Sequence, residues 1–435
     1  MLFLTCLTVQ GTIKVMTIGD SLTEEYHFET PFSAPNSDPA NANTMNWVEI
    51  LSDYRGADIS FGNYEGVQIA YPDYRRSGYE YNWGIPGYDT VMWMNIIQAP
   101  IGIFDFSLES FSRRKMRQQY NEVDVIVVMV GGNDVRANYG DLYDPEPGDL
   151  TPEQFKTNVK NNLGEIIDEI RSVRSNLPIV LADIPHLSAA PDIIADHPDA
   201  SKRANVIAVV DSLNQELVAF ASSRGVNLAP ISSLTTDLLS PDTYYIGAIE
   251  MIKNAHPENP SNYLFCKAGL HPSTNGQARI ANTLLTAINS ATSSNTLILP
   301  DREILINLLN LDPDQPYLDW VAGKGIIDTS FSLDSDGDGI PNLGEYLLGL
   351  EPLITDTYNA KLKSIDGSTM LTMDYSPDAA AGRLAETSIK QSNNLIDWNP
   401  ISASNIHSMA NGTMQVRLPS TDSKLFLKME FKLRP

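Results

Sequence analysis

Cysteine is nearly absent from this sequence, since only Cys6 and Cys266 occur among 435 residues. Two thiols cannot form a disulfide framework. Long apolar runs are also missing, because no stretch approaches the roughly 18 uninterrupted apolar residues that a membrane helix needs. Hydrophobic residues still make up 42% of the chain, enough for a large core. The sequence therefore predicts a soluble globular protein with no transmembrane segment.

Positive charge is scarce as well. The chain has 30 Lys and Arg residues against 54 Asp and Glu residues, which gives a formal net charge of -24. An acidic surface of this kind repels the phosphate backbone of DNA and RNA. We therefore expect no nucleic acid partner.

Strand-like and helix-like segments alternate through the first two thirds of the chain. Buried strands are predicted at residues 12–18, 123–130, 178–184 and 226–231. Amphipathic helices are predicted at residues 151–176, 201–224 and 273–289. This alternation predicts an α/β fold with a parallel sheet covered by helices on both faces, in which ligands bind at the carboxyl ends of the strands.

Four segments differ in composition and are expected as domains or linkers. The apolar residues 1–11 lack a positive n-region and are interpreted as a signal-peptide remnant or an N-terminal extension. Residues 12–292 form the predicted α/β domain, and residues 293–354 a linker that contains an acidic loop. Short alternating runs separated by Gly, Asn, Ser and Asp predict a small all-β domain at 355–435.

Four short motifs lie where strands of the α/β domain are expected to end. The first strand runs into G-D-S-L-T, which places Ser21 at a strand-to-helix turn. Gly87 lies in the turn I-P-G-Y, and Asn133 in G-G-N-D after the most hydrophobic strand. His271 lies in L-H-P-S, just before the last predicted helix. Each motif alone also fits an ordinary turn or helix cap.

Together, and in this order, the four motifs resemble the SGNH (GDSL) hydrolase family over roughly residues 12–290. The resemblance implies a flavodoxin-like three-layer αβα sandwich and ester hydrolysis through an acyl-enzyme, with no cofactor for catalysis. It implies that Ser21 is the nucleophile and His271 its general base. It also implies an oxyanion hole formed by the backbone N–H groups of Ser21 and Gly87 and the side chain of Asn133.

One position departs from the family pattern D-x-x-H, because Ala268 stands where the acid is expected. Three explanations remain open. A Ser-His dyad can work with a backbone carbonyl near residue 268 holding the imidazole. A carboxylate can come from elsewhere, with Asp183, Glu250 and Glu258 as candidates. The enzyme can also be weakened or disabled. We favour retained esterase activity, because loss of the acid in a triad costs about four orders of magnitude in rate and leaves a catalyst.

Aromatic residues gather around Gly87 and bear on the substrate. They are Tyr64, Tyr71, Tyr74, Tyr79, Tyr81, Trp83 and Tyr88. Aromatic faces beside a site suit sugar rings, and this region resembles the carbohydrate-esterase branch of the family. The leading hypothesis is removal of short acyl groups, above all acetyl, from a polysaccharide or oligosaccharide. The alternatives are a short-chain esterase or lipase of broad specificity, and a catalytically weakened domain that serves as a glycan-binding or surface module.

The acidic loop D334-S-D-G-D-G-I-P-N-L-G-E345 has the spacing of a calcium-binding loop. Its predicted ligands are Asp334, Asp336, Asp338, the carbonyl of Ile340, Asn342 and Glu345. The loop resembles thrombospondin type 3 and dockerin loops, which work at the millimolar calcium found outside cells. We therefore expect structural Ca²⁺ and a secreted, extracellular or periplasmic location. The tail resembles C-terminal β modules of secreted bacterial proteins, and carbohydrate binding, cell-surface attachment and secretion sorting stay open as its role.

Overall fold

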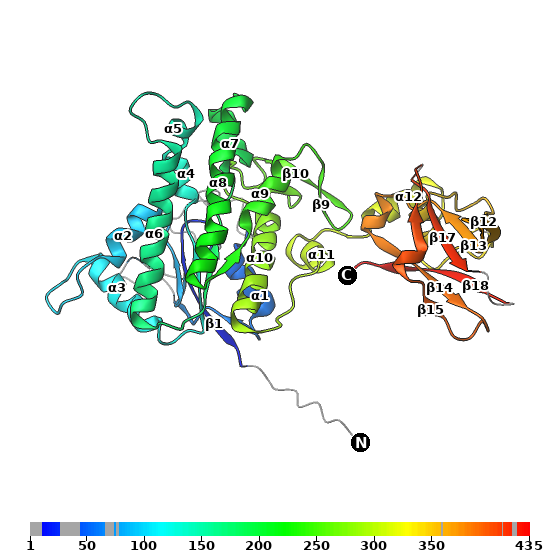
Figure 1. The fold of residues 1–435 in the computed structure, drawn as a ribbon, viewed down its shortest axis with the longest axis horizontal. Coiled ribbons are helices and arrows are strands. Elements are labelled where there is room, and N and C mark those ends of the chain that lie inside the picture. The colour runs from blue at the N-terminus through cyan, green and yellow to red at the C-terminus, as the bar shows by residue number, and fades with distance from the viewer. Residues whose placement is uncertain are drawn as a thin grey trace, which may run out of the picture. The chain divides into compact units, whose positions relative to one another are not determined.

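The computed structural model describes residues 11–26, 44–65, 74, 78–357, 360–410, 412–419 and 424–435. The chain divides into two compact units (Figure 1). The first comprises Met1–Tyr244 and Met251–Leu299, and the second comprises Tyr245–Glu250 and Pro300–Pro435. Residues 1–10 of the expected signal remnant lie outside the described residues. No helix in the described ranges is both long enough and apolar enough to cross a membrane.

A parallel sheet forms the centre of the first unit. Its strand order is β2-β1-β6-β7-β8, and β5 pairs with the carboxyl-terminal half of β1. The strands are β1 (Ile13–Gly19), β2 (Ile59–Ser60), β5 (Asn82–Gly84), β6 (Val125–Met129), β7 (Ile179–Ala182) and β8 (Asn227–Ala229). Every residue of β6 is buried, as an apolar strand covered on both faces requires. The register pairs Gly19 with Met129, so that β1 and β6 end at the same edge of the sheet.

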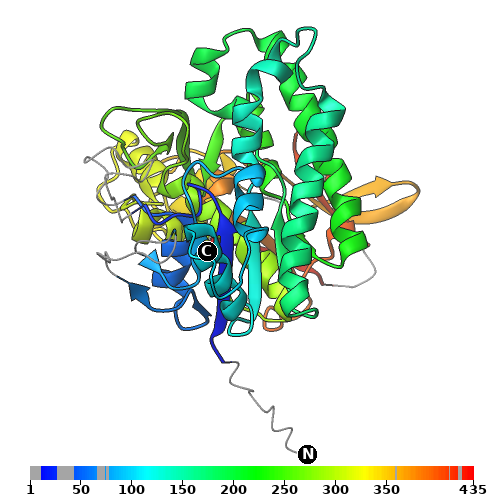
Figure 2. The same cartoon turned by 90° about the vertical axis from the view of Figure 1, so that its left-hand side faces the viewer.

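Helices cover both faces of this sheet. The helices are α1 (Trp47–Arg55), α2 (Thr90–Ile97), α3 (Leu108–Gln119), α4 (Gly132–Ala137), α5 (Tyr139–Tyr143), α6 (Pro152–Val173), α7 (Pro191–Asp196), α8 (Ala200–Arg224), α9 (Ile231–Leu239) and α10 (Thr274–Thr292). Helix α10 packs on α1 and on strands β6, β7 and β8, whereas α6 packs on α2 and α8. Figure 2 shows α6, in teal, side by side with α8, in green. The predicted α/β sandwich is therefore confirmed.

Local sequence signals explain where the long helices begin and end. Thr151 caps α6, because its side chain accepts from the Gln154 amide while the Gln154 side chain reaches back to the amide of Thr151. Pro152 occupies the first turn of α6, where its missing N–H costs nothing. Gly225 ends α8 with a φ of 57°, the left-handed conformation that favours glycine.

Short strands interrupt the alternation before α10 and after β2. A three-stranded sheet of order β11-β10-β9 is formed by β9 (Tyr244–Ile246), β10 (Ile249–Ala255) and β11 (Tyr263–Phe265). A small pair is formed by β3 (Tyr64–Glu65) and β4 (Gly78–Tyr79). Strands β9 to β11 are therefore an insertion between α9 and α10. The turn that carries His271 directly follows β11.

The second unit combines short helices with two antiparallel sheets, so the predicted C-terminal β domain is present. The helices are α11 (Asp301–Glu303), a π-helical turn (Ile304–Leu308), α12 (Gln315–Gly323) and α13 (Asn342–Leu348). One sheet has the order β12-β13-β17-β16 and the other β15-β14-β18. Their strands are β12 (Lys361–Ile365), β13 (Ser368–Tyr375), β14 (Ala385–Ser392), β15 (Asn399–Pro400), β16 (Ile406–Ser408), β17 (Met414–Pro419) and β18 (Phe426–Leu433).

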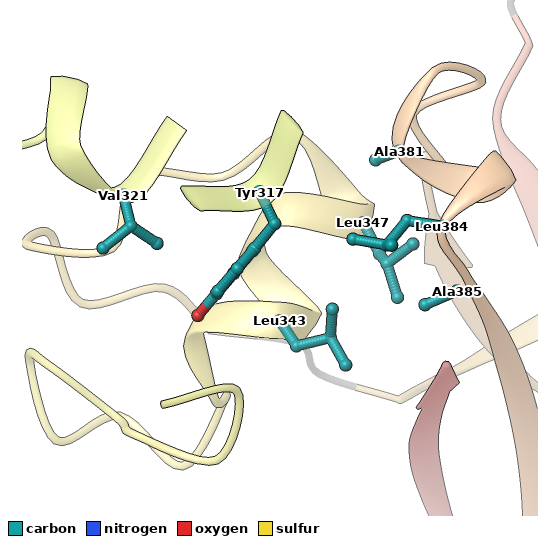
Figure 3. Close-up of a cluster of buried hydrophobic side chains, with 7 residues drawn as sticks. All are labelled: Tyr317, Val321, Leu343, Leu347, Ala381, Leu384 and Ala385. Atoms are coloured by element: carbon teal, nitrogen blue, oxygen red, sulfur yellow. The ribbon is translucent and has the colours of Figure 1, made fainter. Parts of the chain in front are cut away.

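Two apolar clusters hold the second unit together. One lies between the two sheets and includes Met373, Ile389 and Val416. The other joins α12 and α13 to the chain before β14, as Figure 3 shows. Its buried members are Tyr317, Val321, Leu343, Leu347, Ala381, Leu384 and Ala385. Residues 300–354, within the segment expected as a linker, therefore pack with the strands in one unit.

Candidate active site

Ser21 lies in a tight turn at the carboxyl end of β1. The amides of Thr23 and Glu24 donate to the Asp20 carbonyl at 3.0 and 3.1 Å, which closes the turn. Glycine is needed here for space, because a Cβ on Gly84 would lie 2.4 Å from the amide nitrogen of Glu24. The neighbouring strand β5 can therefore approach the turn closely, and it supports the backbone that carries Ser21.

His271 reaches Ser21 from the other end of the domain. Between β11 and α10 the chain folds back on itself, with the Cys266 amide donating to the His271 carbonyl at 2.9 Å. The imidazole Nε2 lies 2.8 Å from Oγ of Ser21, which is hydrogen-bonding distance. Both residues are only 7% exposed. The structure thus brings together the two residues that the sequence predicts as nucleophile and base.

The other ring nitrogen, Nδ1 of His271, is buried and has no hydrogen-bond partner within the described part of the chain. Ala268 is exposed, and no backbone carbonyl of the described residues accepts from Nδ1, as the dyad hypothesis expected. Among the proposed acids, Asp183 is engaged elsewhere, because its carboxylate accepts from the Ser232 amide and from the Ser232 hydroxyl at 2.6 Å each. Neither Glu250 nor Glu258 is bound to this nitrogen.

The environment of the imidazole favours its neutral form. Burial, together with a smaller effect of the positive charge of Arg136, lowers the pKa of His271 to about 4. At neutral pH the ring is therefore unprotonated and free to accept a proton. Arg136 lies in α4, three residues beyond Asn133, and no sequence motif pointed to it.

Of the two remaining predicted residues, Gly87 lies in the turn before α2 and Asn133 lies in the first turn of α4. Gly87 is exposed in the turn closed by the Tyr88 amide and the Ile85 carbonyl at 3.2 Å, and its φ of 76° suits glycine. The Asn133 side chain donates through Nδ2 to the Tyr88 carbonyl at 3.0 Å, and it keeps a second N–H. The backbone N–H groups of Ser21 and Gly87 donate to no acceptor among the described residues.

A cleft lies beside Ser21 and His271. Its floor carries Asp20, Asn133 and Arg136, whereas its walls come from the loop after β7 and from α9, β11 and α10. The apolar wall residues are Leu187, Ala189, Ala190, Ile231, Leu234, Leu238, Leu264, Phe265, Leu270 and Ile280. Most of the surface that a substrate would meet beyond the Ser-His pair is therefore apolar.

Comparison with known families agrees with the geometry. Residues 15–284 match the model of a family described as GDSL-like lipase/acylhydrolase. The chain belongs to this family. No curated protein sequence matches the chain.

Solved structures of low identity resemble this GDSL-like acylhydrolase. A carbohydrate esterase family 3 protein from Talaromyces cellulolyticus is 13% identical, with 65% of this chain and 100% of that chain covered and a TM-score of 0.35. A variant of an acetyl xylan esterase from Geobacillus stearothermophilus is 15% identical, with 64% and 95% covered and a TM-score of 0.31. An extracellular lipase from Streptomyces rimosus is 14% identical, with 65% and 100% covered and a TM-score of 0.36.

Two acidic residues of the GDSL-like domain lie under the site and were not predicted as part of it. Asp20 precedes Ser21, and burial raises its pKa to about 7, with a smaller contribution from the charge of Asp134. Burial also raises the pKa of Asp134 to about 6, although this carboxylate accepts from the amide and the hydroxyl of Thr90. The Thr90 contacts tie the G-G-N-D loop to the start of α2 and so fix the position of Asn133.

The aromatic residues around Gly87 mostly pack against one another. Tyr64 and Tyr79 are in edge contact at a centroid distance of 5.0 Å, and Trp83 is fully buried. Tyr74 and Tyr88 are in edge contact at 5.8 Å. Tyr71 lies outside the described residues. None of the described aromatic residues of this group lines the cleft, so packing accounts for most of the aromatic cluster.

The acidic loop of the second unit gathers its carboxylates as its spacing predicts. Asp334, Asp336 and Asp338 each have a carboxylate oxygen within 4.8 Å of the others. Asp338 and Glu345 form a second such group with Asp356, a residue that the sequence pattern did not include. Burial, and then the charges of the surrounding aspartates, raise the pKa of Glu345 to about 7. Asn342 is fully buried.

Proposed function

We propose that this chain is a serine esterase that hydrolyses carboxylic esters through an acyl-enzyme. The observation that carries the proposal is the 2.8 Å separation between Oγ of Ser21 and Nε2 of His271. A serine hydroxyl is a weak nucleophile until an adjacent base takes its proton. Membership of the GDSL-like lipase/acylhydrolase family supports the same reaction.

In the proposed reaction, Ser21 Oγ attacks the ester carbonyl carbon while His271 Nε2 takes the hydroxyl proton. The oxyanion that forms accepts hydrogen bonds from the N–H groups of Ser21 and Gly87 and from the second N–H of Asn133. His271 then gives its proton to the leaving alkoxide, and the alcohol departs. Water attacks the acyl-enzyme by the reverse sequence, and the carboxylic acid is released with Ser21 restored.

The proposed base works without a carboxylate on Nδ1. The low pKa of His271 keeps the imidazole neutral and able to accept a proton, but the imidazolium formed in the transition state gains no charge stabilisation from an acid. A triad that loses its acid keeps its geometry and loses about four orders of magnitude in rate. We therefore propose a slow but real esterase rather than an inert domain.

We propose that the acyl group lies along the apolar wall of the cleft. Leu234 and Leu238 of α9 face the same space as Ile280 of α10. Burial of each methylene group against such a wall contributes about 0.8 kcal/mol. An ester of an apolar acyl chain is thus the substrate that this lining supports best.

Acetyl esters of a polysaccharide or oligosaccharide are the second candidate. The observation in favour is the pair Tyr74 and Tyr88, because Tyr88 directly follows Gly87 and its carbonyl accepts from Asn133. An aromatic ring beside the oxyanion loop could support a sugar on the alcohol side of the ester. With either substrate, we propose that the protein acts outside the cytoplasm. We also propose that the second unit attaches to glycans or to a cell surface.

An active-site probe tests the proposal directly. A fluorophosphonate should label the wild-type chain and the Ser233→Ala control, whose serine is exposed on α9, and should not label Ser21→Ala. Labelling should depend on folded protein and should be lost after heating. Equal labelling of Ser21→Ala, or no labelling of the wild type, would refute the esterase and favour a non-enzymatic glycan-binding module.

A further inference from the structure

The acidic loop of the second unit lies between α12 and α13. Five carboxylates meet there in two overlapping groups that share Asp338. Asp334 and Asp336 belong to one group, and Glu345 and Asp356 belong to the other. So much negative charge in one place is destabilising unless a cation neutralises it.

Two carboxylate oxygens of this cluster are buried and have no hydrogen-bond partner among the described residues. Glu345 is 0% exposed, and its Oε1 has no hydrogen-bond partner among the described residues. Oδ2 of Asp336 is likewise buried and without a partner. Leaving such atoms unsatisfied is destabilising, because carboxylate oxygens lose their water on burial. Both atoms belong to residues of the two carboxylate groups, so one bound cation would satisfy them.

We propose that Asp334, Asp336, Asp338, Glu345 and Asp356 bind a calcium ion, with Asp356 closing the site from outside the loop. Every one of these side chains offers oxygen, and no histidine or cysteine takes part in either group. Oxygen-only sites rich in carboxylates favour hard cations over zinc or copper. Calcium accepts six to eight oxygens in flexible geometry, which suits five carboxylates on a loop better than the strict octahedron of magnesium.

The backbone already holds the loop in the shape that binding requires. The amides of Gly337 and Gly339 donate to the two carboxylate oxygens of Asp334 at 2.8 Å each. Gly339 has a φ of 95°, so only glycine fits this sixth position without strain. The amide of Asp356 donates to Asp338 Oδ2 at 2.7 Å, which brings the chain after α13 against the loop.

The proposed ligand set differs from the one that the sequence spacing predicts. The Asn342 side chain is buried, and the amide orientation that matches its neighbours points its nitrogen at the Leu333 carbonyl at 3.1 Å and at Glu345 Oε2 at 3.3 Å. Asn342 therefore orients Glu345 in place of binding the ion. Asp356 takes over as the ligand, and it lies outside the twelve-residue template.

The proposed site is connected to the core of the second unit. Helix α13 places Leu343 and Leu347 in the apolar cluster with Tyr317 and Leu384 (Figure 3). Glu345 lies between these two leucines in the sequence and so projects from a different side of the helix. An ion held by Glu345 and Asp356 would tie α13 to the chain that follows it, and binding should raise the stability of this unit.

Calorimetric titration of the full chain, stripped of metal with a chelator, tests this proposal. We expect one Ca²⁺ per chain, a higher thermal midpoint for the second unit with calcium, and much weaker binding of Mg²⁺. Asp356→Asn should weaken calcium binding by at least about tenfold. The matched control Asp366→Asn changes an exposed aspartate with a φ of 51° in the β12–β13 turn, and it should bind as the wild type does.

Each other result would count against the site. No calcium binding at about 5 mM, above the range of extracellular modules, would overturn it. Equal affinity of Asp356→Asn and wild type would remove Asp356 from the ligand set, and equal binding of Mg²⁺ would overturn the assignment to calcium. If Glu345→Gln fails to fold, Asp336→Asn provides the same loss of a ligand at a less buried position.

Discussion

Oγ of Ser21 lies 2.8 Å from Nε2 of His271, although 250 positions separate the two residues in the chain. The sheet makes this contact possible, because β1 delivers Ser21 to the carboxyl edge and the turn before α10 returns to the same edge. The second ring nitrogen of His271 has no partner among the described residues.

The acid limb of the pH profile should lie unusually low. Because the pKa of His271 is lowered to about 4, the base stays unprotonated and kcat/KM should hold until the pH falls to about 4. Arg136→Gln removes a positive charge that opposes protonation, so the pKa of His271 should rise and the acid limb should move to higher pH. Arg434→Gln, in the second unit, is the control. If the acid limb of Arg136→Gln lies at the same pH as that of the wild type, the charge of Arg136 does not lower the pKa of His271.

Restoring an acid at residue 268 should increase the rate. Ala268→Asp places a carboxylate three residues before His271, where it can accept from Nδ1 and stabilise the imidazolium. Since loss of this acid costs about 10⁴ in a triad, we expect at least a tenfold gain in kcat. Ala268→Asn, which has a similar size and no charge, should gain far less. Unchanged kcat in Ala268→Asp would mean that the aspartate does not reach Nδ1.

Gly84→Ala should damage catalysis without touching the reacting atoms. The added Cβ would lie 2.4 Å from the Glu24 amide nitrogen and 2.6 Å from the Thr23 carbonyl carbon, so the turn with Ser21 must shift. A displacement of about 1 Å can lower kcat roughly 100-fold. Gly140→Ala has open space and lies in α5, so its activity should equal that of the wild type. Normal kcat in Gly84→Ala would show that the turn tolerates the shift.

Acyl-chain length should distinguish the two proposed substrates. If the apolar wall binds the acyl group, kcat/KM for p-nitrophenyl esters should rise by up to about fourfold per methylene until the wall is covered. In Leu238→Gln, kcat/KM should increase less with chain length, and hydrolysis of p-nitrophenyl acetate should be unchanged. Leu239 does not line the cleft, so Leu239→Gln should behave as the wild type. A preference for acetyl esters, with acetate release from acetylated xylan, would instead support the carbohydrate substrate.

Much of the fold follows from local pattern. Apolar runs such as Val125–Met129 predict buried strands, and the Thr151 cap with Pro152 predicts where α6 begins. Parallel strands end at one edge, so motifs after successive strands are expected to meet there. The sequence therefore predicts that Ser21 and Asn133 belong to one site.

Other features of the two sites depend on segments that are far apart in the sequence and share no sequence motif. The cleft wall combines α9, β11 and α10, and its apolar character appears only when their leucines and isoleucines face one space. Arg136 affects His271 through proximity alone. Asp356 joins the acidic loop from eleven positions beyond the end of its template, at a distance that no spacing rule covers.

The sequence by itself determined the order of strands and helices, the turn residues and the chemical types present at the strand ends, because these follow from periodicity and backbone sterics over a few residues. Only the tertiary structure decided which side chains meet: that Nδ1 of His271 lacks a partner among the described residues, that the cleft is apolar, and that Asp356 faces Glu345. Such contacts depend on how distant segments pack, and packing minimises the free energy of the whole chain, which no short stretch of residues specifies.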